Sequence, residues 1–451
     1  MPVLLAPRGR AIRIVFEGRP IEAFEGEPVA MALHRHGVRT FSRSLKYRKS
    51  RGLLCMSGAC AQCMVNVDGI PNVRACITRA QDGMAVRRQR GWPSTEHDLV
   101  SFFLGIRELE AGFQYKAGIT LWPVFMWAYT HLTGAGDLEI DKVPKVDYSY
   151  RAVERDVVVV GGGPAGLGAA LELASTPLRF TLIEQMPWLG GEQALFEGEK
   201  AGLPSEGGAR TIEEVSSAIG ADSKLLETTA VGFYKPNSLL AVGRNYKELV
   251  QLKAQRFVFA TGGYEDIPLI ENSDVPGFYT YRASLIMSRG YEVKPGESGV
   301  VIGDGARADL VRQRLEGAGM RIVQVSPKDV VRVTGSRRVT GVVVSAEGGH
   351  RTIRADFAVA ADGINPRCEL PYQAGAKVEY DEEARNYRPT HDGSMRSTEV
   401  VYTAGSMCGS TSYQESFRQG RMAALAVAHE LTKDKDYETG MLELAGRGPT
   451  P

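Results

Sequence analysis

DVVVVGGGPAGLGAALELASTPLRFTLIE, residues 156–184, is the stretch that decides the fold. Residues 157–160 form an apolar, β-branched run, which predicts a strand buried on both faces. A glycine-rich turn follows, and the pattern then predicts a helix over 167–174 and a second strand over 180–183. With Glu184 at its end, this order is a complete βαβ dinucleotide fingerprint, a G-x-G-x-x-G turn between strand and helix with an acid about 20 residues further on.

Each part of this fingerprint has a chemical role. Gly161 makes the tight turn, and Gly163 lets the backbone approach a pyrophosphate that sits on the helix N-terminus. Gly166 lets helix and strand pack closely, and Glu184 accepts hydrogen bonds from an adenosine ribose. The predicted contacts also include the neighbours Pro164, Ala165 and Gln185. We therefore predict nucleotide binding, against the alternative of a glycine-rich turn without a ligand.

Length, charge and cysteine count set the broad class. The chain has 451 residues, enough for about three domains, and its net charge of +1 implies no nucleic-acid partner. The N-terminus lacks the apolar core of a secretory signal, and the longest apolar stretch, residues 119–129, is too short for a membrane span. We therefore expect a cytoplasmic protein. Six cysteines are too few for a disulfide scaffold in a chain of this length.

Four cysteines follow the spacing C-x4-C-x2-C-x12-C, at Cys55, Cys60, Cys63 and Cys76. The first three match the loop of plant-type [2Fe–2S] proteins, in which four thiolates hold the cluster. The spacing to Cys76 is shorter than in plant ferredoxins. Structural zinc and inert core cysteines are the alternatives, although zinc sites favour paired C-x2-C knuckles.

Residues 1–95 are predicted to form a ferredoxin-like [2Fe–2S] domain. Hydrophobic patterns give strands over 11–16, 20–24 and 64–67 and a helix over 29–36. A basic run precedes the cysteines, with Arg43, Lys46, Arg48, Lys49 and Arg51. It is either a solvated loop or a docking face whose charge raises the cluster's reduction potential. The aromatic-rich residues 96–155 are predicted to be a linker that packs this domain against the rest of the chain.

Further glycine motifs extend the nucleotide site. The pair ending in Gly191 and the strand end Ala260-Thr261-Gly262 are typical of flavoproteins with two dinucleotide-binding domains. Gly405 precedes a long helix over 414–431 that faces the flavin in that class, but Ser406 stands where the class has an aspartate for the ribityl chain. We predict FAD, or another adenine nucleotide such as NAD or ATP, bound to a domain of residues 156–270 and 370–451. Val231 completes the predicted contacts.

A second strand–turn–helix–strand pattern, residues 299–325, lies in a predicted inserted domain of residues 271–369. Ala308 replaces its third glycine, Asp304 puts a negative charge where a pyrophosphate would lie, and no acid follows its second strand. We expect a retained Rossmann-like fold here and no NAD(P). Cys408 lies near a helix start, which would lower a thiol's pKa, but a small buried residue is the favoured interpretation of Cys408 and Cys368.

Three further segments carry a family resemblance: KYRKSRG at 46–52, VDGIPNVRAC at 67–76 and WPS at 92–94. With the glycine motifs, they resemble the α (large) subunit of heterotetrameric sarcosine oxidase and its relatives. Those relatives are subunits of opine oxidases, dye-linked proline or hydroxyproline dehydrogenases and hydrogen cyanide synthase. The resemblance extends through Leu431. It implies an α/β chain with an N-terminal ferredoxin-like domain and a two-dinucleotide-binding flavoprotein fold.

The resemblance also implies a function as part of a complex. A flavoprotein β subunit resembling glycine or sarcosine oxidase would take a hydride from the carbon next to a secondary amine. Electrons would pass to FAD in this chain or to FMN at the subunit interface, then to the cluster and an external acceptor. A small additional subunit is compatible with this family. The expected class is an oxidoreductase acting on CH–NH donors, in the dehydrogenase or opine-oxidase branch.

Two departures from sarcosine oxidase favour the dehydrogenase or opine-oxidase branch, and two other functions stay open. Sarcosine oxidase itself lacks the cysteine set present here, which is the first departure; the second concerns the length of the chain. Sarcosine oxidase continues into an aminomethyltransferase-like region that handles tetrahydrofolate, and we expect that half-reaction to be absent from a chain that stops at Pro451. No catalytic base is identifiable, because none of the seven histidines lies in a motif. The alternatives are a self-contained NAD(P)H-dependent reductase and a non-catalytic scaffold stabilised by a nucleotide.

Overall fold

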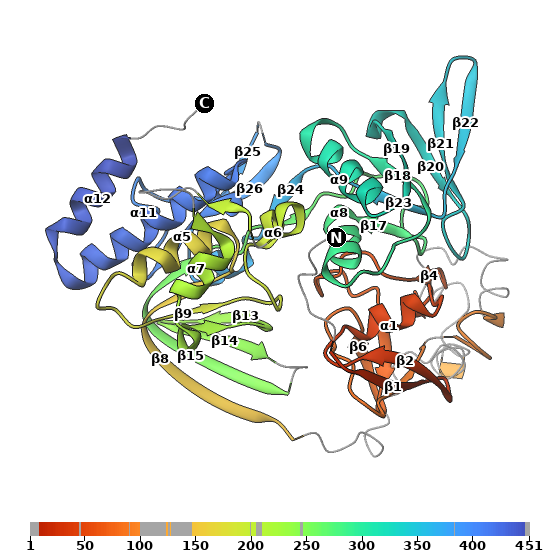
Figure 1. The fold of residues 1–451 in the computed structure, drawn as a ribbon, viewed down its shortest axis with the longest axis horizontal. Coiled ribbons are helices and arrows are strands. Elements are labelled where there is room, and N and C mark those ends of the chain that lie inside the picture. Colours follow the sequence, from red (N-terminus) through yellow and green to blue (C-terminus); the bar gives the residue numbers. More distant parts are fainter. Residues whose placement is uncertain are drawn as a thin grey trace. The chain divides into compact units, whose positions relative to one another are not determined.

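The computed structural model describes residues 9–44, 47–89, 91–99, 123–124, 127, 147–198, 200–203, 210–243, 247–382 and 384–446. The chain forms two compact units. Unit 1 comprises Met1–Lys145 and Ile267–Asp362, and unit 2 comprises Val146–Asp266 and Gly363–Pro451. Figure 1 labels many of the elements of the two units, which are described separately.

The first part of unit 1 is a small sheet of strand order β2-β1-β7-β5-β6 with one helix. Side chains of β1 alternate between exposed and buried, as expected of a sheet with one solvated face. The elements are β1 (Ala11–Phe16), β2 (Arg19–Phe24), α1 (Val29–Arg35), β5 (Met64–Val67), β6 (Ile70–Arg74) and β7 (Ala85–Arg87), with a two-stranded ribbon of β3 (Ser42–Arg43) and β4 (Ser50–Arg51). The predicted strands and helix of this domain are confirmed within one residue.

The second part of unit 1 is a parallel sheet of order β17-β23-β18-β19 with an antiparallel sheet β20-β21-β22. Its elements are β17 (Phe278–Thr280), α8 (Tyr281–Leu285), η3 (Ile286–Gly290), β18 (Ser298–Ile302), α9 (Gly305–Gly317), β19 (Arg321–Val325), η4 (Pro327–Asp329), β20 (Val330–Thr334), β21 (Gly341–Ala346), β22 (Gly349–Arg354) and β23 (Phe357–Ala360). The predicted second strand–helix–strand unit is therefore present.

These two parts of unit 1 share a packed contact. Leu54, which precedes the first cysteine of the set, belongs to the apolar core beneath β17 and β18. The Thr280 amide donates to the Leu54 carbonyl (3.0 Å), and His34 Nε2 lies 3.1 Å from the Tyr279 hydroxyl. His34 is buried, and burial lowers its pKa to about 3, so this ring is neutral at pH 7. These particular contacts between the cluster domain and the inserted domain are therefore buried and uncharged.

Unit 2 is built on a sheet of strand order β12-β9-β8-β15-β14-β13, with β27 paired to β15. Its strands are β8 (Ser149–Val160), β9 (Phe180–Ile183), β12 (Lys224–Leu225), β13 (Thr228–Tyr234), β14 (Ser238–Gly243), β15 (Glu248–Phe259) and β27 (Val401–Thr403). The long strands β8 and β15 run parallel, and only their second halves are fully buried. β8 begins at Ser149, inside the predicted linker, because its exposed first half pairs with residues 248–254.

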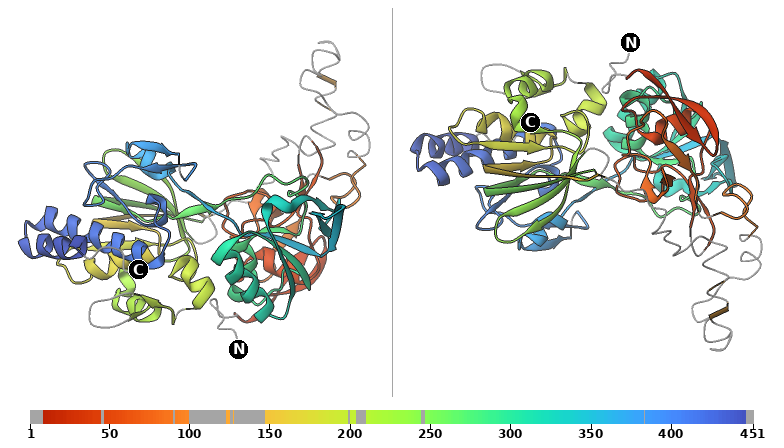
Figure 2. Two further views of the ribbon diagram at one scale, coloured as in Figure 1. Left: turned by 90° about the horizontal axis from the view of Figure 1, so that it is seen from above. Right: turned by 90° about the horizontal axis from the view of Figure 1, so that it is seen from below.

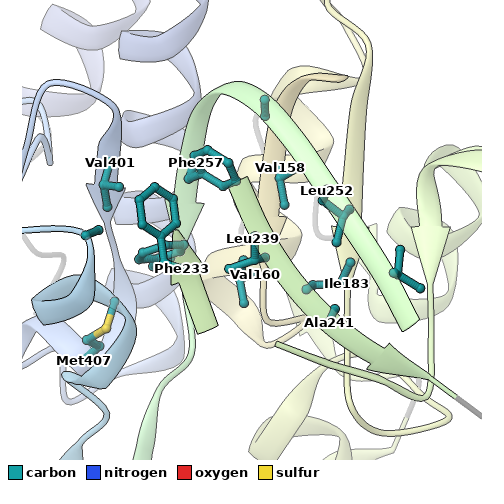
Figure 3. Close-up of a cluster of buried hydrophobic side chains, with 14 residues drawn as sticks. Val158, Val160, Ile183, Phe233, Leu239, Ala241, Leu252, Phe257, Val401 and Met407 are labelled. Atoms are coloured by element: carbon teal, nitrogen blue, oxygen red, sulfur yellow. The ribbon is translucent and has the colours of Figure 1, made fainter. Parts of the chain in front are cut away.

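The main core of unit 2 fills the space between the parallel strands and the β13–β14 hairpin. Figure 3 shows Val158 and Val160 from β8, Leu252 and Phe257 from β15, and Phe233 from β13 pointing into one apolar cluster. Phe233 contacts Phe257 edge to face, with ring centroids 5.0 Å apart. This core fixes the strand ends from which the nucleotide loops start.

Helices cover the other face of this sheet, where α5 and α11 pack together (Figure 2). The two helices approach at glycines: a Cβ on Gly420 would lie 1.8 Å from the Ala165 carbonyl oxygen. The helices of unit 2 are α5 (Pro164–Leu173), α6 (Gly191–Glu197), α7 (Ile212–Ala218), η2 (Ala221–Ser223), α10 (Glu369–Gln373), η5 (Gly405–Cys408), α11 (Tyr413–Thr432) and α12 (Lys435–Gly446). Three small ribbons pair β10 (Gly202–Leu203) with β11 (Arg210–Thr211), β16 (Gly263–Glu265) with β24 (Ile364–Pro366), and β25 (Val378–Asp381) with β26 (Asn386–Pro389).

Most of the predicted aromatic linker lies outside the described residues, as does Lys46 of the basic run. Trp127 is described and is exposed. Among the helices that the structure describes, none is both long and apolar enough to cross a membrane.

Candidate functional site

The glycine turn between β8 and α5 adopts a conformation that side chains would disrupt. Gly161 has φ +105°, and a Cβ there would lie 2.3 Å from the Ala260 carbonyl oxygen. A Cβ on Gly166 would lie 1.7 Å from the Gly161 carbonyl oxygen. The turn therefore folds back tightly on itself and against the end of β15, as the fingerprint predicts.

Gly163 differs from these two glycines. It precedes α5, which has Pro164 at its start, and its φ of −73° is accessible to any residue. A Cβ built on Gly163 meets no atom within 4 Å, so open space lies before the helix. The free N–H groups and the helix dipole make such a position favourable for a phosphate.

Glu184 follows β9 and is held rigidly beside this turn. Its carboxylate is buried and accepts hydrogen bonds from the amides of Gly162 (2.7 Å) and Met186 (2.8 Å). Burial raises the pKa of Glu184, while these amide hydrogen bonds and the charge of Arg367 oppose the shift. Because both oxygens are already engaged by the backbone, this carboxylate is suited to positioning a ribose and poorly suited to abstracting a proton.

A second loop approaches the same turn from η5. Gly405 has φ +87°, and a Cβ there would lie 2.9 Å from the Ala165 Cβ. Ser406 Oγ lies 3.4 Å from the position of a Cβ on Gly262, and a Cβ on Gly191 would lie 3.1 Å from Gly163 Cα. The structure thus brings the predicted residues on four separate loops together in unit 2.

Two residues predicted to contact the nucleotide, Val231 and Gln185, have fewer contacts with the loops around the glycine turn in this structure. Val231 lies on β13 at a register shift of the β13–β14 pair, and its side chain is exposed. Gln185 is half-buried beside Glu184 and donates its amide to that carboxylate. The residue-level assignments of the whole set remain predictions.

The thiol of Cys408, in η5, does not have the lowered pKa of a nucleophilic cysteine. Burial raises the pKa of Cys408 to about 12, so the predicted effect of the helix start is outweighed. Burial also raises the pKa of Cys368 to about 11. Both cysteines are free, and the small-residue interpretation holds for Cys408, which is buried.

The corresponding turn of the inserted domain is arranged differently. Asp304 precedes α9, and its carboxylate accepts a hydrogen bond from Ser326 Oγ at the end of β19 (2.7 Å). A carboxylate at this helix start disfavours a phosphate, and Ser326 occupies the place of a ribose-binding acid. This geometry agrees with the expectation that the inserted domain binds no NAD(P), without testing it.

The four spaced cysteines of unit 1 converge. Cys60 and Cys76 both donate hydrogen bonds to Cys55, and Cys76 also interacts with Cys63. These bonds lower the pKa of Cys55 and, with burial, raise the pKa of Cys60 and Cys76. Four thiols this close ionise together only when cations compensate their charge, so the donor set fits a metal–sulfur cluster.

The arrangement also bears on the kind of metal group. In the described part of the chain, no three or more His, Cys, Asp or Glu side chains surround a position for a single ion. A two-iron cluster does not need one, because each iron takes two of the four thiolates. Gly58, with φ +75°, keeps the loop tight: a Cβ there would lie 2.7 Å from Ile77 Cδ1.

Sequence reasoning missed Asp98 and misjudged two arginines of the basic run before the cysteines. Arg43 and Arg48 of the basic run are buried, so the solvated-loop interpretation is wrong for them: Arg48 pairs with Asp98 (2.8 Å) and Arg43 donates to the Thr95 carbonyl (2.6 Å). Lys49 instead pairs with Asp274 of the inserted domain (3.0 Å). The WPS motif at 92–94 was the available sequence signal for these contacts, because it lies in the segment that Arg43 and Arg48 bond.

Ser57 is a second missed residue, and it yields a prediction. Its Oγ is buried, makes no hydrogen bond of normal geometry and adds to the stronger effect of Cys60 and Cys76 in lowering the pKa of Cys55. A hydroxyl next to a ligand sulfur stabilises the more negative, reduced cluster. Ser57→Ala should lower the cluster's reduction potential by on the order of 50 mV, from a difference of about 1 kcal/mol, in an EPR-monitored redox titration.

Thr78→Val provides the matched control for Ser57→Ala. Thr78 is a buried hydroxyl of the same domain, but it donates to the Arg74 carbonyl (3.0 Å) and contacts no sulfur in that bond. Its replacement should leave the potential unchanged. Equal shifts in both variants would show that Ser57 acts through packing alone.

Together, a thiol cluster site and a dinucleotide turn define an oxidoreductase chain with two redox sites. Residues 9–91 match the model of a 2Fe-2S iron-sulfur cluster binding domain, and residues 155–309 match that of pyridine nucleotide-disulphide oxidoreductases. The chain therefore carries a [2Fe–2S] domain and a flavin-type oxidoreductase domain. Its α/β class with an N-terminal ferredoxin-like domain is confirmed.

The chain is similar in sequence to sarcosine oxidase α subunits and opine oxidase A subunits. It is 27% identical to sarcosine oxidase subunit alpha of Rhizobium meliloti over 95% of this chain and 47% of that protein. It thus spans about half the length of the sarcosine oxidase relatives that it matches. Over 19% of this chain it is 35% identical to hydrogen cyanide synthase subunit HcnA of Pseudomonas aeruginosa, covering 82% of HcnA.

A solved structure supports the same placement. L-proline dehydrogenase from P. horikoshii superposes with a TM-score of 0.72 at 27% identity, covering 98% of this chain and 79% of that one. These comparisons confirm the predicted resemblance to sarcosine oxidase α subunits, opine oxidase A subunits and proline dehydrogenase.

Proposed function

We propose that this chain is the electron-transfer subunit of a heteromeric dehydrogenase or oxidase that acts on the CH–NH bond of a secondary amine, such as an imino acid or opine. A partner flavoprotein β subunit oxidises the amine, and this chain passes the electrons to an external acceptor. The observation that carries the proposal is the presence, in one chain, of a nucleotide turn and four converging thiols. The predicted cytoplasmic location is retained.

The residues support a relay better than an amine-oxidising centre. A bound flavin supplies two-electron acceptance with one-electron release, and a [2Fe–2S] cluster supplies one-electron transfer. Gly163 and the start of α5 bind the phosphates, and Glu184 orients the ribose. Among the described residues of the site, Glu184 is fully engaged by amides, and Cys408 is protonated at neutral pH. Neither is a base for a substrate amine.

One specific observation bears on each of the two alternative functions. A self-contained NAD(P)H-dependent reductase needs the inserted domain to bind a nucleotide, and the Asp304–Ser326 contact disfavours it. A nucleotide-stabilised scaffold is favoured by Ser406, which stands in place of the aspartate that holds a ribityl chain. FMN at a subunit interface would be additional to either site.

Acid extraction of the purified chain, followed by chromatography of the released nucleotides, separates these functions. The proposal expects FAD together with equal amounts of iron and acid-labile sulfide, and amine oxidation only when the β subunit is added. Bleaching of the bound flavin by NADH would favour the reductase. Release of ADP or ATP without flavin would establish the scaffold, and amine oxidation by the chain alone would overturn the partner assignment.

A further inference from the structure

Arg367 lies on the chain segment that passes over the nucleotide turn, directly after β24. Its amide donates to the Gly262 carbonyl (3.0 Å), and Thr261 Oγ1 donates to its carbonyl (3.4 Å). Thr261 and Gly262 form the end of β15, against which Gly161 packs. The backbone of Arg367 is therefore bonded to the segment that itself packs against the glycine turn.

The side chain of Arg367 is held above an aromatic ring. Its guanidinium carbon lies 4.4 Å from the centroid of the Tyr264 ring, a stacking distance for a cation. Its Nε is buried and has no hydrogen-bond partner among the described residues. Its charge acts on the carboxylate of Glu184, whose oxygens are already bonded to amides.

The unbonded Nε–H of Arg367 favours an anionic acceptor beside it. A guanidinium stays protonated in proteins, so a buried N–H of this group costs free energy until an acceptor is present. The backbone of Arg367 bonds Gly262, its charge acts on Glu184, and Glu184 in turn bonds the Gly162 amide of the glycine turn. A neutral ribose satisfies Glu184, whereas the phosphate oxygens of a nucleotide satisfy both the start of α5 and a guanidinium.

We propose that Arg367 binds the diphosphate of the nucleotide held by the Gly161–Gly166 turn and so makes the site selective for phosphorylated nucleotides over nucleosides. This inference rests on the proposed nucleotide site and adds to it a residue outside the glycine fingerprint. Arg367 reaches the ligand from the segment after the inserted domain. It supplies a cation that the glycine fingerprint itself lacks.

The test compares ADP with adenosine as probes, by calorimetry, on the full-length chain after its bound nucleotide has been removed. Arg367→Met keeps the length and the contact with Tyr264 but removes the charge. It should weaken ADP binding about 10- to 100-fold, as expected for loss of a hydrogen bond to a charged group, and leave adenosine binding unchanged. Arg367→Lys should restore part of the ADP affinity, because it restores the charge.

Arg179→Met is the matched control, since Arg179 belongs to the same unit, is 71% exposed and pairs only loosely with Asp156 (3.7 Å). It should change neither affinity. Equal losses for ADP and adenosine in Arg367→Met, or unchanged ADP binding, would overturn the role of Arg367. If the unmodified chain bound neither ADP nor adenosine, the proposed nucleotide site itself would be wrong. That result is distinct from the two outcomes that overturn the role of Arg367.

Discussion

Gly163→Ala should leave the chain folded while weakening nucleotide binding roughly 10- to 100-fold, the effect of forcing a methyl group into an occupied contact. The φ of −73° at Gly163 suits alanine, and the added Cβ meets no protein atom within 4 Å. That space lies at the start of α5, where the pyrophosphate approaches the backbone. The Kd for ADP should therefore rise at an unchanged thermal midpoint.

Gly220→Ala is the control for this prediction. Gly220 also precedes a helical turn in unit 2, has φ −52° and has no atom within 4 Å of its Cβ position. Its substitution should change neither stability nor affinity. Gly166→Ala should instead lower the thermal midpoint, because its Cβ would overlap the Gly161 carbonyl. Normal ADP binding by Gly163→Ala would show that the ligand does not approach this turn.

These glycines illustrate what the sequence is able to predict. The fingerprint is local, so the turn and the flanking strand β9, which is buried throughout, follow from a stretch of fewer than 30 residues. The first half of β8 was not predicted, because it is largely exposed and gains its strand structure from pairing with β15. Burial on both faces produces a readable pattern, and long-range pairing does not.

At the nucleotide turn and beside the cysteines, the sequence shows which side chains are charged but not which residues they contact. Arg367 lies 183 positions after Glu184 in the numbering, and only the fold brings them together. The sequence leaves the basic run before the cysteines open between a solvated loop and a docking face, because Asp98, the partner of Arg48, lies beyond the cluster domain's predicted end at residue 95. Composition predicts charge, and the contact that buries the charge depends on tertiary structure.

Asp98→Ala should destabilise unit 1 by about 3–5 kcal/mol, the usual cost of leaving a buried charge without its partner. The side chains of Arg48 and Asp98 are both 0% exposed, and the guanidinium bonds both carboxylate oxygens (2.8 and 3.0 Å). Asp98 also accepts the Trp92 amide (3.0 Å). The visible absorbance of the cluster, followed during urea unfolding, measures the loss.

A matched set of variants separates the buried charge from the general loss of a side chain. Lys49→Met removes the half-exposed ion pair with Asp274 and should cost less than about 1 kcal/mol. The double variant Arg48→Met with Asp98→Asn should be more stable than Asp98→Ala, because no unpaired charge remains buried. If Asp98→Ala and Lys49→Met unfolded at the same urea concentration, the pair would contribute no more than a surface contact.

The Arg48–Asp98 pair also predicts how the stability of unit 1 depends on pH. Burial alone would raise the pKa of Asp98, but hydrogen bonds from Arg48 and the Trp92 amide, and the charges of Arg48 and Arg43, lower it overall. A lowered pKa in the folded state gives stability that is present above the ordinary pKa of 3.8 and is lost as the pH falls through the folded-state value. Unfolding midpoints measured from pH 6 down to about pH 3 should therefore fall more steeply for the unmodified chain than for Asp98→Asn. Parallel curves would mean that the carboxylate is protonated or exposed, and the loop before the cysteines would then need another anchor.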